Sequence, residues 1–206
     1  MVSGIDDLSN IQLDVLREIG NIGSGNAATA LAKMLNRKVD MDVPRAKILE
    51  FKEVSDTLGS AELPVVGILL KVTGDLTGYI MFILQQQAAA MLVSMLMGKA
   101  SESIETFSEI EVSALKEIGN ILAGSYLSAL SALTNLKILP SIPDMAIDMA
   151  GAILSVPAIE FGKVGDTVLY IETEFSEGTD KVVGDFFLIP DIDTYDVLLK
   201  ALGVIS

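Results

Sequence analysis

The pentapeptide Glu18-Ile19-Gly20-Asn21-Ile22 recurs as Glu117-Ile118-Gly119-Asn120-Ile121, 99 residues further along a chain of 206 residues. The match extends beyond the pentapeptide, because in each copy a proline follows the asparagine with 22 residues between them. These prolines are Pro44 and Pro143. Such agreement in one chain indicates an internal duplication. We therefore expect a single domain, residues 1–206, made of two repeats of about 1–100 and 101–206.

The spacing of the repeated polar residues is typical of one helix face, because positions i, i+4 and i+7 lie within a narrow arc of an α-helix. A glycine continues the arc in each repeat. The residues are Asp14, Glu18 and Asn21, followed by Gly25, in the first repeat, and Ser113, Glu117 and Asn120, followed by Gly124, in the second. We call these two sets the ridges. Each ridge ends where there is no side chain, so another backbone can approach closely.

Two interpretations of the ridges are open at this point. Polar residues on a helix surface are usually just solvated, and duplicated genes retain residues by inertia. Asparagine is a mediocre helix former, however, because its side chain competes for backbone hydrogen bonds. Its retention three residues after a glutamate in both repeats favours a function. Gly20 and Gly119 point the opposite way, where we expect a packed neighbour.

The composition excludes several classes of function. The net charge of −14, from 28 acidic and 14 basic residues, disfavours nucleic acids and anionic membrane surfaces as partners. The chain has neither cysteine nor histidine. This excludes disulfides, Ser-His-Asp and Cys-His catalytic machinery, and the commonest metal ligand, and we expect no metal site in the chain.

The hydropathy pattern predicts a cytoplasmic protein without membrane insertion. Residues 1–10 lack the pattern of a signal peptide. Residues 118–136 and 79–98 carry no charge over about the length of a membrane span. Polar residues interrupt both stretches, so we interpret the two stretches as buried core.

Each repeat shows the same order of expected elements: helix, strand, short helix or turn, two strands, helix. A Ser-x-x-Glu capping box at Ser108 begins the second long helix, Gly74-Asp75 signals a hairpin, and Gly98 ends a helix. This order predicts an α+β fold whose repeats share one core about a pseudo-two-fold axis. The expected ranges are 9–35, 39–51, 52–60, 65–73, 76–84 and 86–97, a linker at 99–105, then 108–136, 138–147, 149–159, 164–174, 181–189 and 192–202.

The doubled pattern resembles the signature of the CheC family. It reads Asp14-x3-Glu18-x2-Asn21-x22-Pro44 and Ser113-x3-Glu117-x2-Asn120-x22-Pro143 in this chain. Members of this family are chemotaxis phosphatases that act on the phosphorylated response regulator CheY. The resemblance covers essentially the whole chain. It implies the CheC-like phosphatase fold and a hydrolase of the aspartyl phosphate of CheY.

The resemblance also implies roles for the ridge residues. Asn21 and Asn120 are expected to orient the attacking water, and Glu18 and Glu117 to pair with the active-site lysine of the regulator. The remaining ridge residues, expected only to contact the regulator, are Asp14, Ser113, Gly25 and Gly124. The chain is expected to need no cofactor of its own, because the Mg²⁺ belongs to the CheY active site.

The expected partners are phosphorylated CheY and the receptor deamidase CheD, with the protein itself a monomer. A non-catalytic adaptor that binds CheY or CheD stays open as an alternative. A flagellar-switch component is a further alternative, which the lack of room for an added switch domain disfavours.

The repeats differ most after their first strand, where Asp148-Met149-Ala150-Gly151-Ala152-Ile153-Leu154 is small and apolar behind one acid. The aligned residues of the first repeat include Glu50, Lys52 and Glu53. Either the second copy of this helix packs deeper, or the segment is a docking site for a second partner. The resemblance suggests CheD as that partner. The residues expected in the interface are Asp148, Gly151, Ala152 and Leu154.

Overall fold

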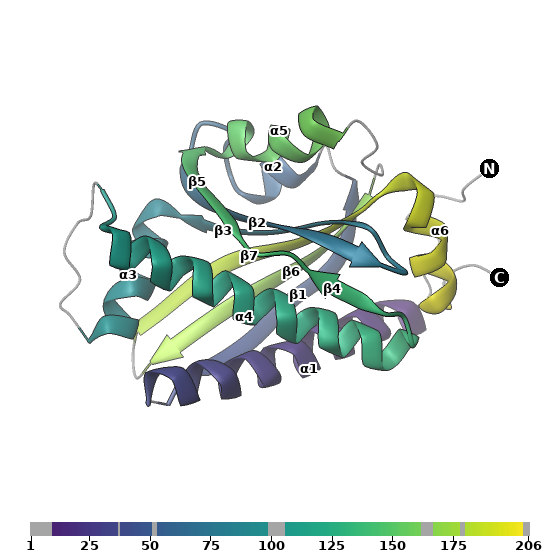
Figure 1. Cartoon of the computed structure of the whole chain (residues 1–206), viewed down its shortest axis with the longest axis horizontal. Coiled ribbons are helices and arrows are strands. Elements are labelled where there is room, and N and C mark those ends of the chain that lie inside the picture. The colour runs from purple at the N-terminus through teal and green to yellow at the C-terminus, as the bar shows by residue number, and fades with distance from the viewer. Residues whose placement is uncertain are drawn as a thin grey trace.

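The computed structural model describes residues 10–36, 38–50, 53–98, 106–161, 167–177 and 180–203. These residues form a seven-stranded sheet with helices on both faces (Figure 1), which confirms the expected α+β class. The first half contains α1 (Asn10–Leu35), β1 (Asp40–Glu50), α2 (Val54–Thr57), β2 (Pro64–Gly74), β3 (Gly78–Gln85) and α3 (Gln86–Met97). The second half contains α4 (Glu109–Thr134), β4 (Ile138–Pro140), β5 (Asp144–Met149), α5 (Ala150–Phe161), β6 (Thr167–Glu177), β7 (Asp180–Pro190) and α6 (Ile192–Ala201).

The sheet joins the two halves by exchanging their first strands. Its order is β1-β6-β7-β3-β2-β4, with β5 also paired to β2, and the pairs are antiparallel. Thus β1 of the first half lies beside β6 of the second, and β4 and β5 of the second lie beside β2 of the first. The hairpin strands β3 and β7 meet at the centre. The order reads the same from either edge, which is the pseudo-two-fold arrangement expected from the repeated pattern.

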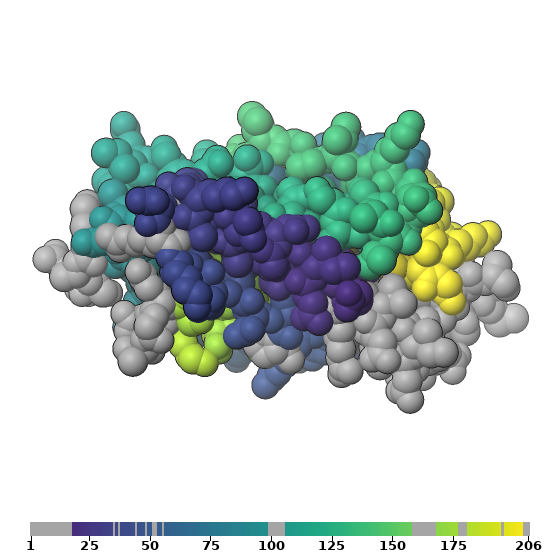
Figure 2. Space-filling model, turned by 90° about the horizontal axis from the view of Figure 1, so that it is seen from below, coloured from purple at the N-terminus to yellow at the C-terminus, as the bar shows by residue number. Residues whose placement is uncertain are grey.

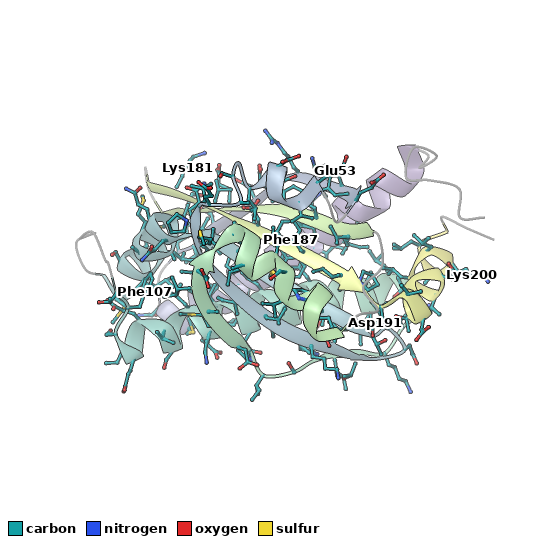
Figure 3. All side chains as sticks on the ribbon, turned by 90° about the horizontal axis from the view of Figure 1, so that it is seen from above. Glu53, Phe107, Lys181, Phe187, Asp191 and Lys200 are labelled. Atoms are coloured by element: carbon teal, nitrogen blue, oxygen red, sulfur yellow. The ribbon has the colours of Figure 1, made fainter. Side chains whose placement is uncertain are left out.

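The sheet separates two hydrophobic cores. Alternate residues of β3 point to opposite faces: Ile80 and Phe82 enter the core under α1, α3, α4 and α6, whereas Met81 and Ile83 enter the core under α2 and α5. Figure 3 looks onto the α2 and α5 face, with Phe187 of the second core near its middle. Because both faces are covered, β3 is an almost continuous apolar run.

The ends of several helices follow from local sequence signals. The carboxylate of Glu111 accepts a hydrogen bond from the backbone N–H of Ser108 at 2.8 Å, as the capping box predicts for the start of α4. Gly98 follows α3 with φ 63, a left-handed conformation that suits glycine. The expected linker at 99–105 lies outside the described residues.

Two expected strands differ in detail from the sequence prediction. The predicted single strand at 138–147 is divided into β4 and β5, and Pro143 lies in the break. A proline has no N–H to donate to a neighbouring strand, so it interrupts the ladder. In β1, Pro44 lies where the register shifts between Asp42 and Arg45 at the edge of the sheet, which confirms the expected bulge or edge position.

None of the described helices combines the length and the hydropathy that a membrane span requires. The two uncharged stretches form parts of the core instead. Phe82 and Leu84 of the first stretch and Leu122 and Leu130 of the second are buried in the core beneath α1 and α4.

Candidate active site

The two long helices that carry the ridges are neighbours on one face of the molecule. Figure 2 shows α1 and α4 side by side, and they run in opposite directions (Figure 1). They approach closely at Gly23, where an added Cβ would run into the ring of Tyr126. The absence of a side chain at Gly23 therefore sets the closeness of the pair.

Tyr126 also anchors α4 to the sheet. Its hydroxyl is hydrogen-bonded to the hydroxyl of Thr173 on β6 at 2.9 Å, and its ring lies 4.5 Å from that of Phe186. Burial raises the pKa of Tyr126 to about 12, although its hydrogen bond with Thr173 acts to lower it. Because this buried hydroxyl has a hydrogen-bond partner, Tyr126 holds α4, and with it the second ridge, in a fixed position on the sheet.

The ridges face away from the sheet, as expected. In the first ridge Glu18, Asn21 and Gly25 are exposed, while the side chain of Asp14 lies outside the described residues. The side chains on the opposite face of α1 are buried, among them Ile19, Ala27 and Leu31. The first ridge is therefore an exposed strip on a helix whose other side is held in the core.

The second ridge has the same layout with one difference. Ser113 and Glu117 are exposed, but Asn120 and Gly124 are half-buried. An added Cβ at Gly124 or at Gly25 would meet no atom within 4 Å. Nothing inside the described structure requires these two glycines, which leaves close approach from outside as a use for them.

The other shared glycines have internal neighbours, as expected. A Cβ at Gly119 would lie 2.6 Å from Cγ2 of Ile68, and one at Gly20 would lie 3.0 Å from Cγ1 of Val43. The retained glycines thus fall into two kinds. One kind allows α1 and α4 to pack on the sheet, and the other leaves an open spot on each ridge.

Each ridge has a glutamate carboxylate and an asparagine carboxamide that are neighbours at i and i+3. The carboxamide both donates and accepts hydrogen bonds, and the carboxylate attracts a cation. Within the described ranges, no group of three or more Asp, Glu, His or Cys residues could hold a metal ion. The chemistry available on the described part of each ridge is therefore orientation and charge pairing.

The residues expected at the CheD interface are only partly available. Asp148 on β5 is exposed, and Gly151 and Ala152 in the first turn of α5 are half-buried. Leu154 is 7% exposed and belongs to the core under α2 and α5, so a partner could not contact its side chain. The first turn of α5 is tied to the loop before β2, because the N–H of Gly151 donates to the carbonyl of Ala61 at 2.8 Å. The available surface is thus Asp148, Gly151 and Ala152.

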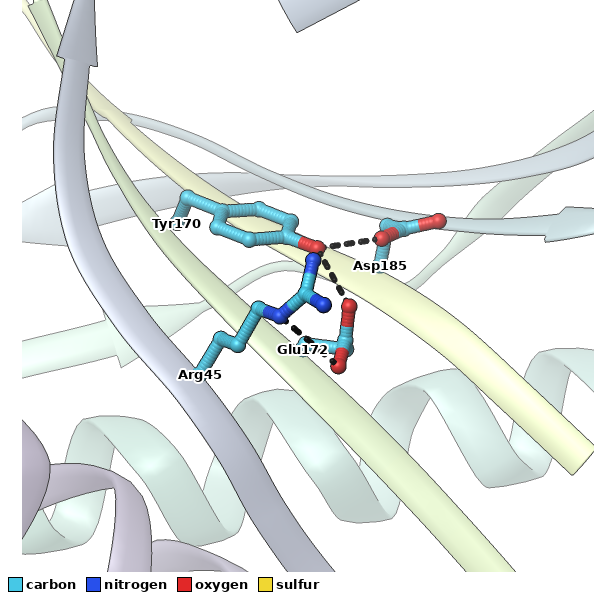
Figure 4. A network of polar contacts seen from close by, with 4 residues as sticks. All are labelled: Arg45, Tyr170, Glu172 and Asp185. Atoms are coloured by element: carbon cyan, nitrogen blue, oxygen red, sulfur yellow. Dashed lines mark hydrogen bonds and ion pairs between the residues drawn. The ribbon is translucent and has the colours of Figure 1, made fainter. Parts of the chain in front are cut away.

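A polar network on the α2 and α5 face was missed by the sequence analysis (Figure 4). The Tyr170 hydroxyl lies 2.8 Å from Oδ1 of Asp185 and 3.2 Å from Oε2 of Glu172, and Arg45 lies 3.8 Å from Glu172. Burial raises the pKa of Asp185 from 3.8 to about 6; the hydrogen bond from Tyr170 lowers it and the charge of Glu172 raises it further. The available signal was a lone acid, Asp185, within the apolar run of β7.

Comparison with known proteins identifies the family of the chain. The CheC-like family pattern matches residues 11–48 and 110–146, the segments that hold the two long helices and the strands after them. The chain is 43% identical over 196 residues to the CheY-P phosphatase CheC of Bacillus subtilis (strain 168), covering 93% of this chain and 94% of that protein. The chain belongs to the CheC-like family.

Two further relatives carry the name FliY. The flagellar motor switch phosphatase FliY of Bacillus subtilis (strain 168) is 32% identical over 135 residues, which are 65% of this chain and 35% of that longer protein. The crystal structure of FliY from Thermotoga maritima superposes with a TM-score of 0.74 at 27% identity, over 96% of this chain and 98% of that chain. The expected CheC-like fold is thereby confirmed.

Proposed function

We propose that this protein is a phosphatase of phosphorylated CheY, with one active site on each ridge. The observation that carries the proposal is the pair of outward-facing Glu–Asn sets on α1 and α4 in a chain 43% identical to a CheY-P phosphatase. The proposal places the protein in the cytoplasm as a component of chemotaxis signalling.

In this proposal Asn21 and Asn120 orient the attacking water. A carboxamide can accept a hydrogen bond from the water and donate one to a phosphoryl oxygen, so it fixes the water in line with the phosphorus. Glutamine performs the equivalent task in GTPases. The water attacks phosphorus, the bond from phosphorus to the aspartyl oxygen breaks, and inorganic phosphate and the free carboxylate of the regulator result.

Glu18 and Glu117 pair with the active-site lysine of the regulator. Such a pair, once desolvated by docking, fixes the register of the two proteins more than it adds affinity. The Mg²⁺ that neutralises charge on the phosphoryl group belongs to CheY, and the chain supplies no cofactor. Gly25 and Gly124 allow the backbone of the regulator to approach, because an added Cβ at either position points into open space.

The test is the release of inorganic phosphate from phosphorylated CheY with and without a substoichiometric amount of this protein. A phosphatase releases many equivalents of phosphate for each molecule added. The alternative, an adaptor that captures CheY or CheD, would leave the spontaneous rate unchanged or slow it. A flagellar-switch role would instead require stable association with basal bodies.

We further propose that CheD docks beside the first turn of α5, on Asp148, Gly151 and Ala152. Asp148 lies opposite Val65 of β2, and the side chain of Val65 is in the core under α2 and α5. Directly opposite residues share a sheet face, so Asp148 points away from the α1 and α4 face. This surface leaves both ridges free, so CheD and CheY can bind together.

Reversing the charge at Asp148 with Asp148→Lys, or enlarging Ala152 with Ala152→Lys, should weaken capture of purified CheD about tenfold. Thermal unfolding of each variant controls for the fold. Undiminished capture of CheD by both variants would move the interface elsewhere without affecting the proposed phosphatase activity.

A further inference from the structure

The edge strand beside α4 carries exposed apolar side chains on its helix-covered face. Ile147 and Met149 of β5 are 42% and 51% exposed. Ile147 lies opposite Val66, whose side chain is in the core beneath α4, so Ile147 is on that face of the sheet. Met149, two residues further along the strand, shares this face. Helix α4 packs on this face of the sheet but leaves the side chains of Ile147 and Met149, on the edge strand, exposed.

Contacts of α4 with the sheet place this row next to the second ridge. A Cβ on Gly119 would lie 2.6 Å from Cγ2 of Ile68, and Ile68 lies opposite Met145 of β5. Met145 is therefore at the level of Gly119, the neighbour of Asn120 in sequence. Ile147 lies about 7 Å further along the strand. Since α4 and β5 run in opposite directions, this brings Ile147 toward the part of α4 that carries Glu117 (Figure 1).

A third apolar side chain extends the ridge itself. Ile110, in the first turn of α4, is 69% exposed and lies one turn before Ser113. We call Ile110, Ile147 and Met149 the apolar flank. Its members are on α4 and on the strand beside it, and all border the N-terminal half of the second ridge.

The edge strand beside α1 differs in character. On β1 the helix-covered face includes Ala46, opposite Ile171, and Glu50, opposite Thr167. At the 99-residue offset of the repeats, Ala46, Ile48 and Glu50 of β1 correspond to Met145, Ile147 and Met149 of β5, so the two rows differ at the first and third positions. The isoleucines Ile110 and Ile147 have isoleucine counterparts in the first repeat, Ile11 and Ile48, whereas Met145 and Met149 are replaced there by a small residue and an acid.

We infer that the apolar flank is part of the surface on which phosphorylated CheY docks at α4, and that it makes the α4 site the tighter-binding of the two. The inference rests on the proposed function. A protein docked over Asn120 with an ordinary footprint of about 800 Å² covers a circle of roughly 16 Å radius, which includes Ile147. The polar ridge supplies orientation, whereas burial of the flank supplies affinity that salt does not screen.

The test uses two single-site enzymes. Asn21→Ala leaves only the α4 site, and Asn120→Ala leaves only the α1 site. The flank variant is Ile147→Thr with Met149→Gln, which adds polar atoms at exposed positions, while threonine keeps the β-branched shape that favours a strand and glutamine nearly keeps the length of methionine. The matched control is Ile192→Thr on α6, a 59% exposed isoleucine at the far end of the molecule (Figure 1).

In the Asn21→Ala enzyme the flank variant should raise KM for phosphorylated CheY about tenfold with little change in kcat. In the Asn120→Ala enzyme the same variant, and in both enzymes the Ile192→Thr control, should leave KM unchanged.

An unchanged KM in the Asn21→Ala enzyme overturns the inference and leaves the proposed function standing, because hydrolysis there still depends on Asn120. An equal rise of KM in both enzymes overturns it too, since that is a general structural effect. Lost capture of CheD with unchanged KM would assign the flank to that partner instead. Failure of the proposed function has separate signatures: no acceleration of phosphate release by the wild type, or full activity in the Asn21→Ala, Asn120→Ala double variant.

Discussion

The α1 and α4 ridges carry the same acid and carboxamide in different surroundings. Both present them outward on long helices that pack on one core. Asn21 is exposed, whereas Asn120 is half-buried beside an edge strand with exposed apolar side chains. Both repeats thus keep the groups proposed for chemistry and the glycines that let the helices pack on the sheet. The residues around the two ridges differ. Similar chemistry with different affinity is the expected consequence.

The largest expected effects are those of Asn21→Ala and Asn120→Ala on turnover and KM. Each change should reduce turnover at its own ridge about 100-fold, because the water loses its orienting group. Each single variant therefore keeps the activity of the other ridge. The remaining activity should show a lower KM in Asn21→Ala than in Asn120→Ala. Phosphate release at varied concentrations of phosphorylated CheY gives both values, and equal KM values would remove the affinity difference between the ridges.

A smaller effect is expected from the half-buried Asp185, which belongs to neither ridge. Its pKa of about 6 in the folded protein exceeds the ordinary value of 3.8, so the folded state binds more protons between these values. The free energy of unfolding should therefore fall as pH rises from about 4 to about 6, by at most about 3 kcal/mol. Asp185→Asn keeps an acceptor for Tyr170 and should flatten this slope. Denaturant unfolding at pH 4.5 and pH 7 measures the difference, and an unaltered slope in the variant would contradict the assignment.

The smallest effects separate the two kinds of glycine within one helix. Gly124→Ala should stabilise the protein by about 1 kcal/mol, because alanine is the better helix former and its Cβ meets open space. Gly119→Ala should destabilise it by roughly 1–3 kcal/mol, because its Cβ would press on Ile68. Gly20→Ala should cost less than Gly119→Ala, since its contact with Val43 is longer.

Gly124→Ala should also raise KM at the α4 site while it stabilises the fold, because the proposal uses this open spot for docking. Thermal unfolding and phosphate release, measured on the same preparation, test the expected rise in stability and the expected rise in KM together. Destabilisation by Gly124→Ala would mean that the glycine serves the fold of the protein.

Local features were predictable from the sequence because local signals determine them. The capping box at Ser108, the helix end at Gly98 and the outward direction of both ridges follow from patterns within one or two helical turns. The repeated pentapeptide also predicted the symmetric organisation. The CheC-like fold came from the resemblance, and the similarity to known proteins confirmed it.

The remaining features depend on contacts between distant segments. The exchange that places β1 beside β6 joins residues more than a hundred positions apart, as in the pair of Leu49 and Val168. Likewise, Leu154 is buried because α5 packs on the sheet, and Asp185 meets Glu172 only through the pairing of β6 with β7. Ile147 and Met149 lie on the edge strand β5 and stay exposed on the helix-covered face, which no periodicity of the sequence indicates.

Phosphate release from phosphorylated CheY, measured with the Asn21→Ala, Asn120→Ala double variant beside the wild-type protein, tests whether the two ridges are the active sites. The wild type should accelerate release at substoichiometric concentration, whereas the double variant should return it to the spontaneous rate. The double variant should keep a cooperative thermal transition, because Asn21 is exposed and Asn120 is only half-buried. Wild-type acceleration by a folded double variant would contradict the assignment of the ridges as active sites.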